Sequence, residues 1–577
     1  MLRTKNDGEL REKDAGSEVV LTGWVSKVRN LGSLVFVDLR DRYGITQIKI
    51  DPSLFEKTPL KNEFCIQVKG KVAVRQDKNP NLPTGDIEVL ASEIRVFAES
   101  QLTPFIIADK TDALEDTRLK ERYLDLRRPC LQKNLMIRAK AIRSVHEYMD
   151  SHSFVEVETP TLIKSTPEGA RDYLVPSRTF PGEFYALPQS PQIFKQLLMI
   201  GGMDRYYQIA RCYRDEDLRA DRQPEFTQID CEMSFVDRED VLGVIEGLLD
   251  KVFKDVLDVT LPKFARLSYA DAINLYGSDK PDMRFGMLLN DVTDLLGNEG
   301  FEAYHGKAVK CLLVKNVAKE TSRKKMDQLN DLAKKFRVHG VAFFKFEGGV
   351  FASSLAKYFK KETLDELAKR VEAEENDLLI VGADESNDKI AVALGAIRSY
   401  YGKELGLTDP HVYKPLFVLD WPLFEREDDG HYESLSNPFT RPRDEDLKYL
   451  DTDPTKVLSY AYDTVMNGYE LSSGSLRIFD GNLQKKVFEL LGLDDDAIKE
   501  RFGFFVHAFD FGTPPHGGFA IGVERLSMIL CATDNIRDVV AFPKNLQAAD
   551  VMCSAPSYVP KENTDILGIE VKEKESN

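Results

Sequence analysis

The chain has 577 residues, more than one hydrophobic core normally holds, so we expect three or more domains. Apolar residues make up 42% and charged residues 30%, as in a globular enzyme, and no apolar run is long enough to span a bilayer. The first residues lack the apolar segment of a signal peptide, so we expect a cytoplasmic protein. The net charge of −17 argues weakly against nucleic-acid binding, although a local basic face is compatible with it.

The metal-ligating residue types are scattered along the chain. None of the seven cysteines forms a C-x-x-C pair, and the eight histidines are dispersed. This pattern argues against a disulfide framework, a zinc site or a histidine-based metal centre.

Short strands dominate the first part of the chain, residues 1–105. Several strands within about a hundred residues are typical of a small barrel of the OB type, a fold that commonly binds oligonucleotides. Lysines and arginines on these strands supply phosphate partners, and Phe36 is either a base-stacking surface or a core residue. The predicted strands are 19–29, 34–40, 45–50, 64–74 and 86–90.

Residues 106–130 are charged and are predicted to form a hinge with a short helix. An amphipathic helix is predicted next, over 131–151, because apolar residues recur along one stripe. The alternating run 154–160, which ends in proline, is predicted to be a strand.

A loop and a helix start follow. Residues 164–170 contain Pro and Gly, which favour a mobile loop. Further on, Ser190 is the predicted N-cap of a helix whose first residue is Pro191. Gln192 and Lys195 are three residues apart and therefore share one face of that helix.

The stretch 205–236 is predicted to be a hairpin, since two runs with period two flank the charged loop 215–225. One alternative is an exposed hairpin with a salt-bridged tip. The other is a binding site, because burying a polar strand face is costly unless something is bound there. The polar face would carry Arg214, Gln228, Asp230 and Glu232.

The run from Arg214 to Asp230 resembles motif 2 of the class II aminoacyl-tRNA synthetases, in the form found in bacterial-type aspartyl-tRNA synthetases. The segment 154–160 with its preceding helix resembles motif 1, which forms the twofold interface in that class, so the resemblance implies a homodimer. The N-terminal barrel resembles the anticodon-binding domain of the family. The loop 164–170 resembles the loop that closes over the bound amino acid.

The resemblance also implies the domain order. The hinge 106–130 is followed by the first catalytic part, 131–285, and by a second part, 409–577. Between them, 286–408 has its own predicted strands and helices, and bacterial-type members carry such an inserted α+β domain. The predicted fold class is therefore α+β and multidomain, with an OB barrel, an antiparallel-sheet catalytic domain and the insert.

A second hairpin, 460–477, turns at Asn467-Gly468, a strong two-residue turn signal. That register pairs Val465 with Glu470 and makes Asp463 and Glu470 diagonal neighbours, about 7–8 Å apart. Two carboxylates at that spacing repel each other unless a cation lies between them. They form either a Mg²⁺ site completed by phosphate oxygens or a solvated acidic face.

Near the end of the chain, a predicted strand runs into a helix through Gly522, with Arg525 in the first helical turn. The helix dipole disfavours a cation there, but a bound polyphosphate would reverse that preference. This segment resembles motif 3 of the same class.

The resemblance implies an aspartate–tRNA ligase that joins aspartate to ATP with Mg²⁺ and then charges tRNA(Asp). One departure is Ser436-Asn437, which stands where the family has a pair of histidines. The alternatives are an asparagine-specific or non-discriminating ligase and a non-catalytic RNA-binding paralogue. The implied aspartate-binding residues are Glu168, Gln192, Lys195, Arg214, Asp230, Ser436 and Arg477. The implied ATP-binding residues are Arg214, Asp215, Glu216, Gln223, Phe226, Glu470, Gly522, Val523, Glu524 and Arg525, of which Arg214 and Arg525 are catalytic. The implied metal ligands are Asp463 and Glu470, and the implied anticodon-binding residues are Arg29, Phe36, Gln47, Arg75 and Glu88.

Overall fold

The computed structural model describes residues 2–166, 169–427 and 429–572. Its contacts divide the chain into two compact units: Met1–Met136 with Val540–Ser557, and Ile137–Val539 with Tyr558–Asn577. Among the described residues, no helix is both long and apolar enough to cross a bilayer. The predicted domain boundaries at residues 105, 130, 285 and 408 stay predictions.

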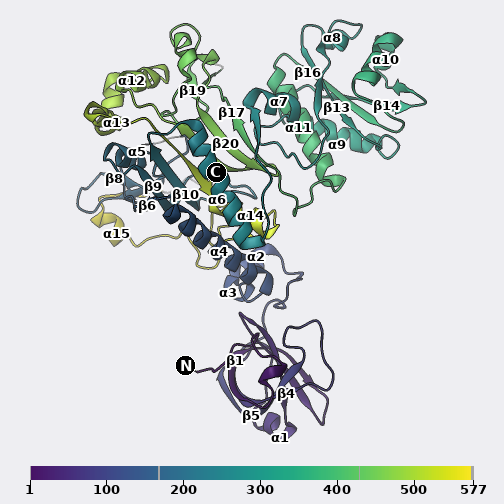
Figure 1. Ribbon diagram of the computed structural model, residues 1–577, viewed down its shortest axis with the longest axis vertical. Helices are drawn as coiled ribbons and strands as arrows, with labels where there is room; N and C mark the ends of the chain where they lie inside the picture. Colours follow the sequence, from purple (N-terminus) through teal and green to yellow (C-terminus); the bar gives the residue numbers. More distant parts are fainter. Residues whose placement is uncertain (1, 167–168, 428, 573–577) are drawn as a thin grey trace. The chain divides into compact units, whose positions relative to one another are not determined.

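In the first unit, five strands close into a barrel in the order β1-β2-β3-β5-β4, which confirms the predicted barrel (Figure 1). Apolar residues such as Val35 and Val37 alternate into the barrel interior, whereas Phe36 between them is only partly buried, on the outer face. The core alternative for Phe36 is therefore wrong. The elements are β1 (Glu18–Asn30), β2 (Val35–Asp41), β3 (Gly44–Ile50), α1 (Pro52–Lys57), β4 (Cys65–Val74), β5 (Ile87–Ala98), α2 (Glu115–Lys120) and α3 (Arg122–Asp125).

The second unit is built on an eight-stranded sheet with the order β11-β17-β20-β21-β22-β10-β9-β6 (Figure 1). Neighbouring strands are antiparallel except at the two ends, where β11 pairs with β17 and β6 with β9 in parallel. The sheet therefore has the predicted antiparallel centre. Its strands are β6 (Val155–Glu156), β9 (Arg205–Tyr213), β10 (Glu225–Ser234), β11 (Ala265–Ser268), β17 (Pro415–Leu419), β20 (Ala461–Met466), β21 (Tyr469–Leu476) and β22 (His516–Gly522).

The two faces of this sheet have different surroundings. One face packs against α4 (Pro129–Ser151), α6 (Arg238–Leu257) and α14 (Val523–Cys531) through a large apolar core. Ile229 and Cys231 of β10 belong to that core, so the alternate residues Gln228 and Asp230 point to the other face. On that other side, α5 (Gln192–Ile200) contacts β9 and β10, and α13 (Asp495–Ala508) contacts α5 and α12 (Gly481–Leu490). The helices thus leave a polar sheet face for a site.

A separate five-stranded sheet, with the order β12-β13-β16-β14-β15, lies within residues 286–408 (Figure 1). Apolar clusters cover both of its faces, one of them against α9 and α11. The elements of this part are β12 (Leu289–Asp291), α8 (Thr293–Leu296), β13 (Ala308–Val314), α9 (Arg323–Lys334), β14 (Val341–Glu347), β15 (Val350–Ala352), α10 (Lys361–Arg370), β16 (Leu378–Asp384) and α11 (Asn387–Glu404). Helix α7 (Tyr269–Tyr276) precedes this part in the chain. Smaller elements elsewhere are β7 (Leu174–Pro176), β8 (Phe184–Ala186), β18 (Phe424–Arg426), β19 (Tyr432–Ser434) and α15 (Lys561–Ile566).

Three local predictions have clear outcomes. The turn at Asn467-Gly468 is confirmed, with positive φ angles of 56° and 85° at its two central residues. The N-cap prediction for Ser190 is wrong, because α5 begins at Gln192 with Pro191 at the cap and no side-chain hydrogen bond to the helix end. The predicted strand 154–160 is reduced to the two residues of β6 at the sheet edge.

Candidate active site

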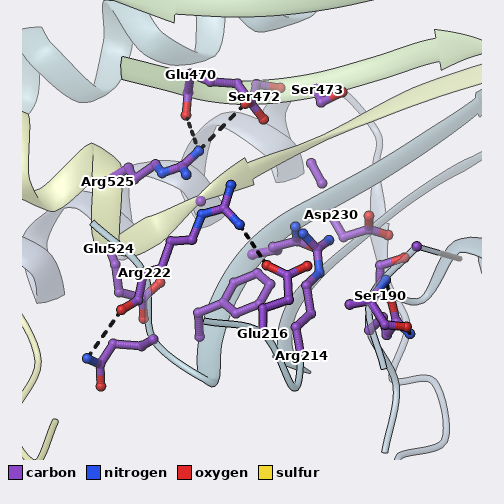
Figure 2. A pocket seen from close by; sticks show the side chains of 18 of the residues that line it. Ser190, Arg214, Glu216, Arg222, Asp230, Glu470, Ser472, Ser473, Glu524 and Arg525 are labelled. Carbon is purple, nitrogen blue, oxygen red and sulfur yellow. Dashed lines mark hydrogen bonds and ion pairs between the residues drawn. The ribbon is translucent and has the colours of Figure 1, made fainter. Parts of the chain in front are cut away.

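A cavity of about 380 Å³ opens on the polar face of the eight-stranded sheet. It is lined by residues of β10, β21 and β22, by the start of α5 and α14, and by the loop 215–225 (Figure 2). Several segments far apart in the sequence therefore meet here. The predicted residues among its lining are Gln192, Lys195, Arg214, Glu216, Gln223, Phe226, Asp230, Glu470, Arg477, Gly522, Glu524 and Arg525.

Some predicted residues are not in the cavity lining. Asp215, Ser436, Asp463 and Val523 lie outside it among the described residues. Glu168 lies outside the described residues. Asn437 lines the cavity in place of its neighbour Ser436, and its Oδ1 accepts hydrogen bonds from the Phe439 amide and from Thr440.

At one end of the cavity, arginines surround an aromatic ring and acidic groups (Figure 2). The Arg214 guanidinium lies over the Phe226 ring, with 5.1 Å between Cζ and the ring centroid. Arg525 donates to the backbone oxygen of Glu470 at 2.9 Å, and its other terminal nitrogen lies 3.2 Å from Asp221. An aromatic ring beside two guanidinium groups is suited to a nucleotide base and its phosphates.

Two acids at this end already have partners within the protein. Glu216 pairs with Arg222 at 2.7 Å. Glu524 is almost fully buried, and its carboxylate accepts from the Thr227 amide at 3.0 Å and from Arg138 at 2.8 Å. Glu524 therefore joins α14 to β10 and α4 at the edge of the cavity.

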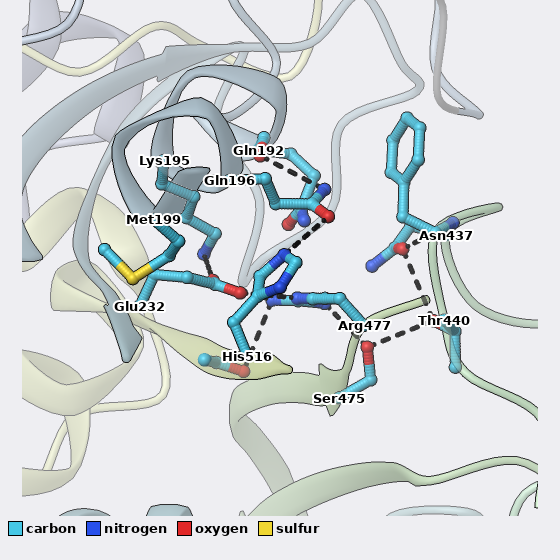
Figure 3. A network of polar contacts seen from close by, with 12 residues as sticks. Gln192, Lys195, Gln196, Met199, Glu232, Asn437, Thr440, Ser475, Arg477 and His516 are labelled. Atoms are coloured by element: carbon cyan, nitrogen blue, oxygen red, sulfur yellow. Dashed lines mark hydrogen bonds and ion pairs between the residues drawn. The ribbon is translucent and has the colours of Figure 1, made fainter. Parts of the chain in front are cut away.

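The other end has a buried charge network (Figure 3). Lys195 donates to Asp230 Oδ1 at 2.6 Å and lies 3.2 Å from Glu232 Oε2. Arg477 binds Glu232 at two points, Nε to Oε1 at 2.9 Å and Nη2 to Oε2 at 3.2 Å. These four side chains are nearly inaccessible, so two cations and two anions are fixed together without bulk water.

The environments of the two acids in this network differ. Burial raises the pKa of Asp230, although Lys195 opposes the shift. For Glu232 burial acts in the same direction, but Arg477 and Lys195 outweigh it and lower the pKa. Within the described part of the chain, Asp230 Oδ2 and Gln192 Nε2 are buried without hydrogen-bond partners. One free acceptor and one free donor at a cavity wall are suited to a small zwitterionic ligand.

The sequence places Glu232 on the polar face of the hairpin, but the implied substrate-binding residues do not include it. The alternation along β10 places it on the same face as Asp230, which was the available signal. Its partner Arg477 lies far along the chain, so the ion pair could not be inferred from local pattern. His516 extends the network, with Nε2 3.1 Å from Gln196 Oε1 and Nδ1 2.8 Å from the Pro514 carbonyl.

The hairpin β20–β21 has the predicted pairing of Val465 with Glu470. A bulge shifts the register next to Thr464, so Asp463 pairs with Ser473. Burial and the neighbouring Glu470 together raise the pKa of Asp463 well above its usual range. Two neighbouring carboxylates are suited to a divalent cation. Among the described residues, no group of three or more acidic, histidine or cysteine side chains is arranged to hold a metal ion.

In the first unit, the five predicted anticodon-binding residues form one connected group on the barrel. Gln47 accepts from Arg29 at 3.0 Å and from Arg75 at 2.8 Å, and it donates to Glu88 at 2.9 Å. Arg29 lies 5.9 Å from the Phe36 ring centroid. A cationic and aromatic surface of this kind is suited to single-stranded nucleic acid.

Comparisons with known proteins identify the family of the chain. The family model for class II tRNA synthetases (D, K and N) matches residues 114–546, and the model for the OB-fold nucleic acid binding domain of anticodon-binding type matches residues 19–97. The chain is 47% identical to the aspartate–tRNA(Asp/Asn) ligase of Geobacillus sp. strain WCH70, with 100% of this chain and 99% of the relative covered. It is also 47% identical to the aspartate–tRNA ligase of Bacillus licheniformis, with 99% of each covered.

Solved structures show the same fold at lower identity. The asparaginyl-tRNA synthetase from Pyrococcus horikoshii complexed with asparaginyl-adenylate matches with a TM-score of 0.60 at 20% identity, covering 94% of this chain and 98% of that chain. A putative aspartyl-tRNA synthetase from Leishmania major Friedlin matches with a TM-score of 0.59 at 18% identity, covering 94% of each.

Proposed function

The chain belongs to the class II tRNA synthetases for aspartate, lysine and asparagine, and from that premise we propose that it is an aspartate–tRNA ligase. It activates L-aspartate with ATP, releases pyrophosphate and transfers the aspartyl group to the 3′ end of tRNA. The observation that supports this most directly is the convergence of Arg214, Arg477 and Arg525 from three distant segments on one cavity. One end of that cavity is suited to a nucleotide, and the other end is a buried network of charged side chains.

In the first step, the aspartate carboxylate attacks the α-phosphorus of ATP. Arg214 would bind the α-phosphate and the attacking carboxylate, where negative charge develops, and fixed donors there stabilise the transition state. Phe226 would stack on the adenine and Arg525 would hold the γ-phosphate. Asp230, with its free Oδ2, would accept the substrate ammonium together with Glu168. No protein nucleophile is required, because both reacting oxygens belong to the substrates.

Selection of aspartate over asparagine would depend on the buried end of the cavity. Arg477 and Lys195 place two positive charges there, with the two-point Glu232 contact fixing the plane of the guanidinium. A side-chain carboxylate offers two acceptor oxygens, whereas an amide offers one acceptor and a competing donor. The asparagine-specific alternative is therefore disfavoured.

Mg²⁺ would be held by Asp463 and Glu470, whose mutual repulsion is described above. When bound, the ion would neutralise charge on the phosphates of ATP. The chain itself contributes the two carboxylates and the adjacent Arg525, which lies 3.8 Å from Glu470 Oε2.

The barrel would bind the tRNA anticodon through Arg29, Phe36, Gln47, Arg75 and Glu88. We also propose a homodimer formed through the motif 1 segment, because β6 is an edge strand and Val155 on it is 45% exposed. A cytoplasmic location accords with tRNA charging. One of the two relatives named above is described for tRNA(Asp/Asn) and the other as an aspartate–tRNA ligase, so charging of tRNA(Asn) is a second candidate activity.

The test is amino-acid-dependent exchange of pyrophosphate into ATP, followed by charging of purified tRNA(Asp) and tRNA(Asn). We expect exchange with aspartate and at least 100-fold less with asparagine. Exchange with asparagine alone would replace the proposal by an asparagine ligase. Binding of tRNA without exchange for either amino acid would favour a non-catalytic paralogue.

A further inference from the structure

A buried arginine of α11 holds a loop of the chain beside the phosphate end of the cavity. Arg398 is 1% exposed, and its guanidinium donates four hydrogen bonds, all to backbone oxygens of one segment. The acceptors are Met287 at 3.0 Å, Asp282 at 2.9 Å, Phe285 at 3.0 Å and Gly286 at 2.9 Å. We call residues 277–288, between α7 and β12, the Lys280 loop.

Among the described residues Arg398 forms no ion pair with a carboxylate, and its side chain packs on aromatic rings. Its Cζ lies 4.1 Å from the Phe285 ring centroid and 5.0 Å from that of Tyr276. Burial lowers the pKa of Arg398 to about 10. Burying a guanidinium is costly unless its donors are satisfied, and here four carbonyl oxygens satisfy them. The same four hydrogen bonds fix the backbone of the loop.

The same loop is also attached to the hairpin β20–β21. Arg284 binds both oxygens of Asp282, at 2.9 and 2.6 Å, and its Nη2 lies 3.5 Å from the carbonyl oxygen of Asn467 in the hairpin turn. A Cβ at Gly468 would lie 3.5 Å from the side chain of Asp282, so the turn and the loop are in close contact. Two arginines thus connect α11 to the strand that carries Glu470.

This attachment places Lys280 next to Glu470. The Lys280 ammonium is 4.0 Å from Glu470 Oε2 and 3.4 Å from Asp279 Oδ2. Arg525 Nη1 approaches the same Glu470 oxygen at 3.8 Å. Both cation distances to Glu470 exceed the roughly 2.7–2.9 Å of a charge-assisted hydrogen bond, so both cations keep donors available for an anion beside this carboxylate.

We propose that Lys280 is a further contact to the β- and γ-phosphates of ATP, and hence to the pyrophosphate product, and that Arg398 is the residue that positions it. The inference rests on the proposed function, because it takes the triphosphate to lie beside Arg525. A lysine on a flexible four-carbon stem, 42% exposed, can reach a polyphosphate held there. Through Arg398, the inserted segment 286–408 acquires a role in ATP binding.

The first test measures binding without turnover. Calorimetry with Mg²⁺ present compares wild type and Lys280→Ala for pyrophosphate, β,γ-methylene ATP and AMP. We expect about tenfold weaker binding of pyrophosphate and the ATP analogue, and AMP affinity within twofold of wild type. Lys254→Ala, which removes an exposed lysine on α6, is the matched control and should leave the affinities for all three ligands unchanged. Unchanged pyrophosphate affinity in Lys280→Ala, or an equal loss for AMP, overturns the assignment.

The second test addresses positioning. Arg398→Lys keeps a cation but cannot reach four carbonyl oxygens, so it should raise the KM for ATP in pyrophosphate exchange while the KM for aspartate stays within twofold. If Arg398 acts through Lys280, the double variant Arg398→Lys/Lys280→Ala should be no worse than Lys280→Ala. Additive losses refute the positioning role.

The outcomes separate this inference from the proposed function. Wild-type protein without aspartate-dependent exchange would refute the function, whereas the calorimetric loss in Lys280→Ala would still support the phosphate contact. Normal wild-type exchange with no loss in Lys280→Ala would refute the contact and leave the function standing.

Discussion

Arg477 and Glu232 form a two-point ion pair at the buried end of the cavity, with nitrogen–oxygen distances of 2.9 and 3.2 Å. Both side chains are at most 2% exposed. The pair joins β10 to the residue that follows β21, and it places a guanidinium plane where the substrate side chain is proposed to bind. Stability and specificity are therefore connected at this contact.

Arg477→Met should be both inactive and unstable. Removal of one member of a buried pair leaves an uncompensated charge, which typically costs about 3–5 kcal/mol. The double variant Arg477→Met/Glu232→Gln removes both charges, so we expect it to regain much of the lost unfolding free energy and still to show no aspartate-dependent exchange. Chemical denaturation and pyrophosphate exchange give the two quantities. A double variant as unstable as the single one would contradict the ion-pair account.

Arg214→Ala should lower the rate of aspartate activation at least 100-fold, the size of loss seen when one fixed donor to a developing negative charge is removed. Its guanidinium lies over Phe226 in the second unit, whereas the residues that we propose bind the anticodon belong to the first unit. Affinity for tRNA should therefore stay within twofold of wild type, measured by filter binding. An unchanged activation rate would refute the proposed role of Arg214.

The sequence predicted those strands whose two faces differ in polarity. Alternation along β10 identified the polar face with Asp230, and Asn467-Gly468 set the register that pairs Val465 with Glu470. In contrast, β13 is apolar on both faces because clusters cover both sides of the inserted sheet. Such a run has no period to distinguish a strand from a buried helix, and we did not predict it.

The details of the site depended on contacts between distant segments. The bulge beside Thr464, which pairs Asp463 with Ser473, has no local signal. The position of Asn437 rather than Ser436 at the cavity depends on how the loop before Phe439 is held by the Asn437 side chain. The sequence therefore located the segments of the site, and tertiary packing decided which neighbouring side chain faces the cavity.

Asn437 and Ser436 give a direct test of that packing. Asn437→Ala removes a polar group from the cavity wall, together with the acceptor for the Phe439 amide, so we expect a three- to tenfold higher KM for aspartate. Ser436→Ala, at the adjacent position outside the lining, should change that KM less than twofold. Steady-state pyrophosphate exchange at varied aspartate measures both. The reverse order of effects would mean that Ser436 faces the substrate.

Phe36→Ala should weaken tRNA charging without affecting aspartate activation. Loss of one base-stacking surface costs about 1–3 kcal/mol, which corresponds to a rise of roughly 5- to 150-fold in the KM for tRNA. Phe97→Ala is a matched control on the same barrel, because Phe97 is also partly exposed and lies 5.3 Å from an arginine, Arg95. It is not part of the group around Gln47, so it should leave the KM for tRNA within twofold. Equal effects of the two substitutions would argue against a specific stacking site.

Asp7 should make the barrel less stable as the pH rises. Burial, then the neighbouring Asp41, raise the pKa of Asp7 from 3.8 to about 8, and neither carboxylate oxygen has a hydrogen-bond partner among the described residues. Between about pH 4 and 8 the unfolded chain loses this proton while the folded chain keeps it. Each pH unit in that window therefore lowers the unfolding free energy by up to about 1.4 kcal/mol, and the loss ends above the folded pKa.

Asp7→Asn cannot ionise, so it should remove this contribution and leave a barrel that is more stable than wild type at pH 8 by several kcal/mol, with little difference near pH 4. The chain has two tryptophans, of which Trp24 lies on β1, so Trp24 fluorescence in a Trp421→Phe background reports unfolding of the barrel. Urea titrations at pH 5 and 8 give the difference between the variants. Asp86→Asn, which removes a carboxylate that is 53% exposed, is the control and should keep the wild-type pH slope. If Asp7→Asn kept that slope as well, the buried carboxyl would not be its source.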